Sequence, residues 1–405
     1  MDQRRHQEPL LDSGRSSEDV ELYHLDGNRR PSFALSESKP QKGAPKLFVA
    51  GALIIAIAGL VTQTESAAYY EDILGWKKPF CSLYIMHSSI ALPWLIHLAY
   101  LRFNQRDKPY SIWVRDYNNG LRASVSTVEA FAVSGPSIVL KRPGSLGGPL
   151  DYLATTMGIV TVVLTVSGVS WFLSLVFTTP SDLTAIYNCS TFFAAAFSVP
   201  ILRQKVGWIG ILAVALSIMG TFTIAYGDTT AHSADSADET PALGASRLFG
   251  NIIALIGAIA FGLYEVLFKK WACPSQSVSP KSSLNLTLAA SALTGVYTFS
   301  FFWIVLVIMH FIGVEPFVLP SLHVLGYVLL SVSAGSVAMT ALLALVTWTS
   351  PVFASVASVL SVFFVAVADW LVFGLDPSLA TYIGGTLIMV AFALLAKEEL
   401  GHGKH

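Results

Sequence analysis

The sequence predicts an all-α membrane protein whose ten transmembrane helices form two five-helix halves, a 5+5 inverted repeat. Three observations predict this class. Hydrophobic residues make up 53% of the 405 residues and charged residues only 13%, against roughly 25% charged residues in soluble domains. Ten apolar segments have the length of a transmembrane helix. One sequence unit also occurs in similar form in both halves of the chain.

The ten apolar segments follow one another from Leu47 onward. None of them shows the ten-residue alternation of an outer-membrane barrel, and all have the length of a helix. The expected spans of the first half are Leu47–Tyr70, Pro79–Leu101, Tyr152–Phe177, Asp182–Leu202 and Trp208–Tyr226. Those of the second half are Leu248–Lys269, Leu284–Ile312, Val324–Trp348, Pro351–Val372 and Thr381–Ala396.

The polar segments divide the chain into five parts. The composition of the first 46 residues is that of a tail too polar to fold alone, and the segment after the second span is basic and rich in Gly and Pro, with little fold of its own expected. The parts are a disordered cytosolic tail (1–46), the first repeat (47–226, with a basic cytosolic loop at 102–150), a lumenal linker (227–247), the second repeat (248–396) and a cytosolic C-terminal tail (397–405).

The distribution of basic residues predicts the orientation. Ten spans place both termini on one side of the membrane. All but three of the 25 Lys and Arg residues fall on that side, and the exceptions are Lys77, Lys78 and Arg247. Cytosolic segments carry such an excess of Lys and Arg. We therefore expect both termini in the cytosol.

The repeated unit supports the two-half organisation. A polar-studded span begins at Pro180 and another at Pro351, and each is followed by a short break and a span that opens with an aromatic residue, Ile and Gly, at Trp208 and Tyr382. Because each half has an odd number of spans, the second half is inverted relative to the first. Inverted repeats are typical of secondary transporters, with the binding site near the midplane between the halves.

Carboxylates inside apolar segments are the first candidates for function, since a charge at a helix centre costs about 2.5–3.5 kcal/mol even on insertion scales. Three carboxylates lie in such a context: Glu65, Glu265 and Asp369. Glu65 and Glu265 belong to the opening spans of the two halves, where either could bind substrate or a proton. The alternative is that both cap helix ends or pair locally with lysines. For Asp369, beside Trp370, an interfacial position is expected.

Polar side chains within the spans are the second set of candidates. They could line a hydrated pathway for a solute, and Asn188 and Thr191 lie on one helical face with small residues. The alternative is that they hold transmembrane helices together. The set consists of Gln63, Tyr187, Asn188, Thr191, Tyr264, Ser355 and Ser358.

The sequence gives no support for a metal site, a cofactor site or an enzyme. Its three cysteines, Cys81, Cys189 and Cys273, have no CxxC spacing, and neither HExxH nor a nucleotide-binding glycine loop occurs. We therefore expect no cofactor, no metal, no nucleic-acid partner and no enzymatic activity. The expected partners are a small-molecule solute and the lipid bilayer, with a homodimer left open.

The hairpin formed by the first two spans resembles one transporter branch. The residues that carry the resemblance are Glu65, Lys78, Pro79, Phe80, Tyr84, Ser88 and Ser89. They resemble the fungal vacuolar-membrane branch of the drug/metabolite transporter superfamily (EamA-like), which is related to the F subgroup of nucleotide-sugar-transporter-like solute carriers. The resemblance implies alternating access and a vacuolar or other endomembrane location. The paired basic residues of many nucleotide-sugar carriers are missing from the late helices, which puts a nucleotide-sugar substrate in doubt.

The predicted function is that of a secondary transmembrane transporter that moves a small polar organic solute by alternating access. Proton coupling through Glu65 or Glu265 is left open. The alternative is a non-transporting membrane receptor or scaffold that retains the transporter fold, with the long tail and the basic loop as its working parts. Transport of solute into reconstituted liposomes separates the two.

Overall fold

The computed structural model describes residues 46–134, 148–175, 177–178, 180–204, 206–227, 241–273, 280–373 and 378–402, and within these ranges it contains helices and no strand. The expected disordered tail lies outside the described residues, apart from Lys46. Most of the expected lumenal linker, residues 228–240, also lies outside them. The described residues all belong to one compact unit of the chain.

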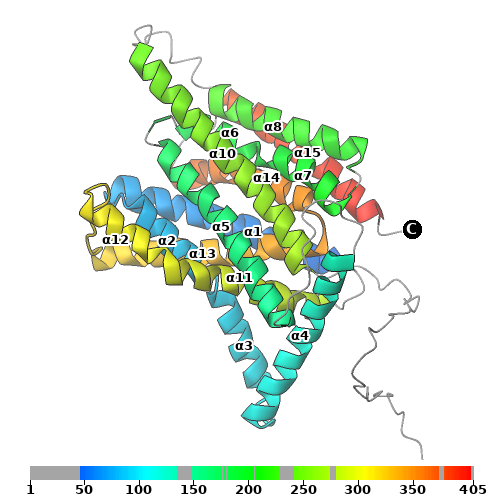
Figure 1. The fold of residues 1–405 in the computed structure, drawn as a ribbon. Helices are drawn as coiled ribbons and strands as arrows, with labels where there is room; N and C mark the ends of the chain where they lie inside the picture. Colours follow the sequence, from blue (N-terminus) through cyan, green and yellow to red (C-terminus); the bar gives the residue numbers. More distant parts are fainter. Residues whose placement is uncertain are drawn as a thin grey trace, which may run out of the picture. The chain divides into compact units, whose positions relative to one another are not determined.

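The helices follow the predicted spans closely in position (Figure 1). Proline occupies the first turn of many of them, where its missing N–H costs nothing and its fixed φ suits a helix. The helices of the first half are α1 (Lys46–Ala68), the π-helical η1 (Tyr69–Ile73), α2 (Pro79–Ser89), α3 (Leu92–Asn104), α4 (Tyr110–Ser134), α5 (Pro149–Leu175), α6 (Pro180–Asn188), α7 (Ser190–Leu202) and α8 (Trp208–Gly227). Those of the second half are α10 (Pro241–Ala272), α11 (Pro280–Phe301), α12 (Trp303–Phe311), α13 (Leu322–Trp348), α14 (Pro351–Phe373) and α15 (Leu379–His402).

Nine helical segments among the described residues are long and apolar enough to cross a membrane. They coincide with nine of the ten predicted spans. The remaining one, in α8, is a shorter apolar helix over Trp208–Ile224. Two helices also run further than expected, because α10 begins at Pro241 inside the expected linker and α15 continues to His402 inside the expected C-terminal tail.

Three predicted spans are interrupted rather than continuous. α2 and α3 are separated at Ile90 and Ala91, α6 and α7 at Cys189, and α11 and α12 at Phe302. At Cys189 the backbone N–H bonds to the carbonyl of Ile186 at 3.1 Å, a one-residue-tighter turn than an α-helix makes. The single helix expected after Pro180 is therefore two helices that meet beside Asn188.

The expectation for segment 102–150 was wrong for much of its length, since α4 occupies 25 of these residues. Its apolar side chains recur at helical spacing, and those buried in the structure are Trp113, Val125, Val128 and Ala132. Val125 and Val128 join the main hydrophobic core. Burial of this one face stabilises the helix, and α4 packs against α5, α10 and α11.

Close contacts at glycine fix how the helices cross. α1 packs along α13, α10 along α5, and α8 along α15, the last pair lying side by side in Figure 1. A Cβ added at Gly59 of α1 would lie 2.8 Å from the Ala334 carbonyl oxygen of α13. One added at Gly220 of α8 would lie 2.6 Å from the Gly384 carbonyl oxygen of α15. Small residues thus bring these backbones together, as in other transmembrane helix pairs.

Candidate functional site

The candidate site lies where α10 meets α7 and α14. α10 approaches α7 closely because residue 262 is glycine: a Cβ there would lie 2.7 Å from the Ala194 nitrogen and 2.8 Å from the Ser190 carbonyl oxygen. α14 contacts both α7 and α10. This crossing brings polar residues of three helices into the middle of the protein, next to the break between α6 and α7.

Glu265 of α10 is the carboxylate at this crossing. Only 4% of its surface is exposed, and Ser355 Oγ of α14 donates a hydrogen bond to its Oε2 at 2.5 Å. Ser355 is itself 1% exposed. The two residues were predicted as separate candidates and are direct partners in the structure. A carboxylate buried among transmembrane helices is rare and expensive, and such residues mark ion, proton or substrate pathways.

Three further polar atoms on α10 and on two helices that contact it, α6 and α7, are buried without a hydrogen-bond partner among the described residues. They are Asn188 Nδ2, Thr191 Oγ1 and Tyr264 OH. Thr191 and Tyr264 are 0% and 1% exposed, and Asn188 ends α6 at the helix break. Leaving a buried polar atom unpaired costs roughly 1–3 kcal/mol. Together with Glu265 they offer hydrogen-bonding groups to a solute that reaches the crossing.

Tyr187 and Ser358 have partners within the protein. The Tyr187 hydroxyl forms a short hydrogen bond with Ser167 Oγ of α5, and its ring lies 5.8 Å from that of Phe261. Ser358 Oγ donates to the Ser355 carbonyl one turn earlier at 2.7 Å. Both side chains therefore join helices or bond within one helix, as the packing alternative expects.

Gln63 belongs to a different contact, where α1 meets α2 and α13. Its Nε2 lies 2.7 Å from the Met86 sulfur, and its side chain packs against Gly335, where a Cβ would lie 2.6 Å from its Oε1. Glu65, two residues later on α1, is half-buried. Neither residue shares a hydrogen bond with Glu265 in the described structure. The side chain of Asp369 lies outside the described residues.

Two charged residues that were not predicted from the sequence fix helix ends. Glu315, 8% exposed, precedes α13 and accepts hydrogen bonds from the backbone N–H groups of Phe80 and Cys81 in the first turn of α2, both at 2.9 Å. Lys269 Nζ of α10 donates to the carbonyls of Val346, Thr347 and Thr349 at the end of α13, at 2.6, 2.7 and 3.0 Å. A negative group at a helix N-terminus and a positive one at a C-terminus both stabilise the helix.

Among known proteins, the chain is similar to fungal membrane proteins. No family model matches it. It is 28% identical over 152 residues to the uncharacterized vacuolar membrane protein YML018C of Saccharomyces cerevisiae, covering 36% of each chain. It is 27% identical over 224 residues to the uncharacterized transporter C405.03c of Schizosaccharomyces pombe, covering 55% of this chain and 62% of that one. A third relative, the thiamine-repressible mitochondrial transport protein THI74 of S. cerevisiae, is 25% identical over 283 residues, covering 67% and 70%.

The match thus spans less than two thirds of the length of the first two relatives. A solved crystal structure, described only as that of a protein, superposes with a TM-score of 0.52 over 85% of this chain and 97% of its own, at 14% identity. That likeness concerns the fold alone. The apolar helices, together with relatives named as a membrane protein and as transporters, support one identification: the chain is a multi-pass integral membrane protein.

Proposed function

We propose that the protein is a secondary transporter that moves a small polar organic solute by alternating access. The observation that carries the proposal is the buried Glu265–Ser355 pair, together with the unpartnered polar atoms of Asn188, Thr191 and Tyr264 on α10 and on helices that contact it. A protein that used this crossing only for packing would gain nothing from polar atoms left unpaired there. A solute with several hydrogen-bonding groups satisfies them.

The two halves form an inverted repeat of five spans each. The shorter helix α8 is counted as the fifth span of the first half. Support comes from the way the helices pair. The first span of each half packs along the third span of the other half, α1 on α13 and α10 on α5. The fifth spans of the two halves, α8 and α15, pack on each other, as do the second spans, α2 and α11. A two-fold axis in the membrane plane, typical of such transporters, relates contacts of this kind.

Glu265 is the group that binds a proton or a cationic part of the solute. A carboxylate in the membrane core needs a proton or a cationic solute group to balance it, so its loading and release can be coupled to the direction in which the site opens. Gln63 and Glu65 lie on α1, the helix that corresponds to α10, and form the pathway on the other half. The drug/metabolite transporter superfamily is the proposed family and the vacuole the proposed location, which the vacuolar relative favours.

We expect both termini on the cytosolic side. Of the 25 Lys and Arg residues, all but Lys77, Lys78 and Arg247 fall on the side of the termini in the ten-span arrangement. Epitope tags at the two ends should be digested by protease added outside sealed vacuoles. A tag that survives until the membrane is dissolved would overturn this orientation and with it the inverted arrangement of the halves.

Transport itself is tested with the purified full chain in liposomes. We expect uptake of at least one compound from a mixture of labelled amino acids, sugars, nucleosides and vitamins, above the level of protein-free liposomes. Thr191→Val preserves the shape of a residue that is 0% exposed and removes its hydroxyl. It should weaken transport of that compound about tenfold, since one hydrogen bond in a buried site contributes roughly 1–1.5 kcal/mol. Absence of uptake across vacuolar metabolites would favour the receptor or scaffold alternative.

A further inference from the structure

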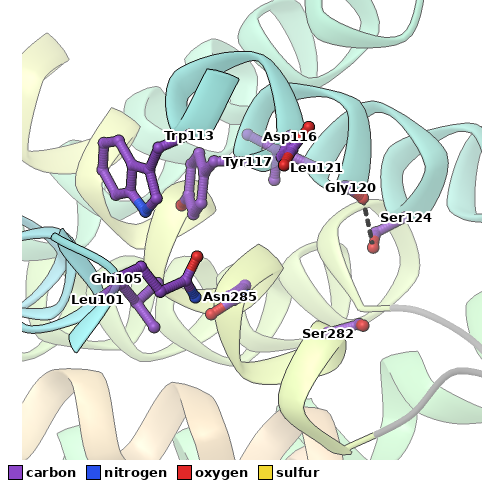
Figure 2. Close-up of a pocket in the computed structure, with 10 residues that line it drawn as sticks. All are labelled: Leu101, Gln105, Trp113, Asp116, Tyr117, Gly120, Leu121, Ser124, Ser282 and Asn285. Atoms are coloured by element: carbon purple, nitrogen blue, oxygen red, sulfur yellow. Dashed lines mark hydrogen bonds between the residues drawn. The ribbon is translucent and has the colours of Figure 1, made fainter. Parts of the chain in front are cut away.

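A pocket outside the proposed transport site lies between the end of α3, the face of α4 and the start of α11. Its volume is about 190 Å³. Figure 2 shows two aromatic rings of α4 on one side and two amide side chains across from them, one from the α3 end and one from α11. The residues that matter for its chemistry are Gln105, Trp113, Asp116, Tyr117, Gly120 and Asn285.

The aromatic side of the pocket is fixed by contacts within the protein. The rings of Trp113 and Tyr117 stack at 6.1 Å with an interplanar angle of 22°. The Tyr117 hydroxyl accepts a hydrogen bond from Trp94 Nε1 at 2.9 Å. Burial raises the pKa of Tyr117, so its own proton stays available for donation. Arg102 holds the turn between α3 and α4 by donating to the Gln105 and Lys108 carbonyls at 3.0 and 2.8 Å.

The opposite side offers polar groups in a defined orientation. Asn285 Oδ1 lies 2.7 Å from His97 Nε2, so the Asn285 amide nitrogen is the group that donates toward a ligand. The Gln105 amide lies beside it in Figure 2. The pocket thus combines a stacked aromatic surface with two amide side chains, and the pocket was not predicted from the sequence.

Two groups at the pocket could attract a cation, a carboxylate and an aromatic ring. Both are already in contact with basic residues of the protein. Lys108 Nζ lies 3.7 Å from Asp116 Oδ2, the carboxylate at the pocket. The Arg102 guanidinium lies 6.0 Å from the centre of the Trp113 ring, within the range of a cation–π contact. These contacts favour a neutral ligand over an ammonium compound. Aromatic surfaces bind any flat ring by stacking, and amides recognise its edge.

We propose that this pocket binds a small, uncharged, planar nitrogen heterocycle, which stacks on Tyr117 and is hydrogen-bonded along its edge by Asn285 and Gln105. The site is separate from the crossing of α7, α10 and α14. Because α4 also packs against α5 and α10, a ligand that bridges α4 and α11 holds these helix ends together. The pocket is therefore a ligand site of the protein apart from the proposed transport site.

The test uses 2-aminopurine, a fluorescent planar heterocycle whose emission is quenched when it stacks on aromatic rings. Titration of the full chain in nanodiscs should give saturable quenching. Gly120→Leu places a side chain in the pocket, and a Cβ at this position meets no atom within 4 Å, so the substitution leaves the helix contacts intact. It should weaken binding at least about tenfold. Tyr117→Leu, which removes the stacking ring, should do the same.

Gly326→Leu is the matched control, because Gly326 of α13 is also a helical glycine with no atom within 4 Å of an added Cβ. It should bind 2-aminopurine like the unmodified protein. Elution volume and melting temperature confirm that each variant is folded. No saturable quenching, equal binding by Gly120→Leu, or equal loss in Gly326→Leu would overturn the proposal. Because this experiment measures binding alone, a negative result would contradict the pocket proposal without contradicting the transport proposal.

Discussion

Glu265→Gln is expected to abolish gradient-driven accumulation of solute in proteoliposomes, with uptake falling at least about tenfold. Glutamine keeps the size of the side chain and an oxygen that can accept the Ser355 hydrogen bond. It can neither bind and release a proton nor balance a cation. Exchange of labelled for unlabelled solute at equal pH should persist, because exchange requires no net proton movement. The measurements are pH-driven uptake and counterflow of the solute found in the liposome screen.

Two variants sharpen this experiment. Glu65→Gln removes a half-buried carboxylate from α1 and gives the comparison on the corresponding helix of the other half. Ser355→Ala leaves the carboxylate but removes its hydroxyl donor, and should shift the pH dependence without abolishing accumulation. Full pH-driven accumulation by both glutamine variants would mean that the carboxylates are structural. The transport proposal would then have to stand without proton coupling.

The spans could be predicted from the sequence because the bilayer sets their length. A run of about 20 apolar residues has no other stable conformation in hydrocarbon than a helix. The interruptions inside the spans could not be predicted in this way. At Cys189 a single tighter turn separates α6 from α7, and neither Gly nor Pro marks the position in the sequence.

The sequence of α4 has the apolar spacing of a helix, but the residues around it are typical of a loop. The surrounding Gly, Pro and basic residues indicate a loop, but Trp113, Tyr117, Leu121, Val125 and Val128 recur every three or four residues. That period is typical of a helix with one buried face. The other residues of α4 are mostly polar, so the segment does not resemble a membrane span. The pocket beside α4 could not be found without first recognising this helix.

The polar candidates were recognised by residue type, but their partners were not. Glu265 and Ser355 are separated by 90 positions in the chain, and they meet because α10 and α14 pack against each other in the fold. A single sequence does not show which residues far apart along the chain lie close together in the fold. The same reason hid the role of Glu315, whose partners at the start of α2 lie 234 and 235 positions away.

Glu315→Ala is expected to loosen the end of the protein where the loop before α13 meets α2. The substitution leaves the N–H groups of Phe80 and Cys81 without their acceptor, which should cost roughly 2–3 kcal/mol because hydrogen bonds to a buried charged group are among the stronger ones. The melting temperature in detergent should fall by a few degrees. Asp107→Ala, which removes an exposed carboxylate at the α3–α4 turn, should leave it unchanged.

Cysteine labelling reports the same contact locally. Cys81 is buried beside Glu315, and the other two cysteines, Cys189 and Cys273, can be replaced by alanine. In that background a maleimide should label Cys81 slowly, and Glu315→Ala should accelerate labelling by about tenfold or more, since losing about 1.4 kcal/mol raises the population of the open state tenfold. We expect opening on this side, under the proposed alternating access, to separate the loop from α2. Unchanged labelling would show that these two hydrogen bonds do not hold that side closed.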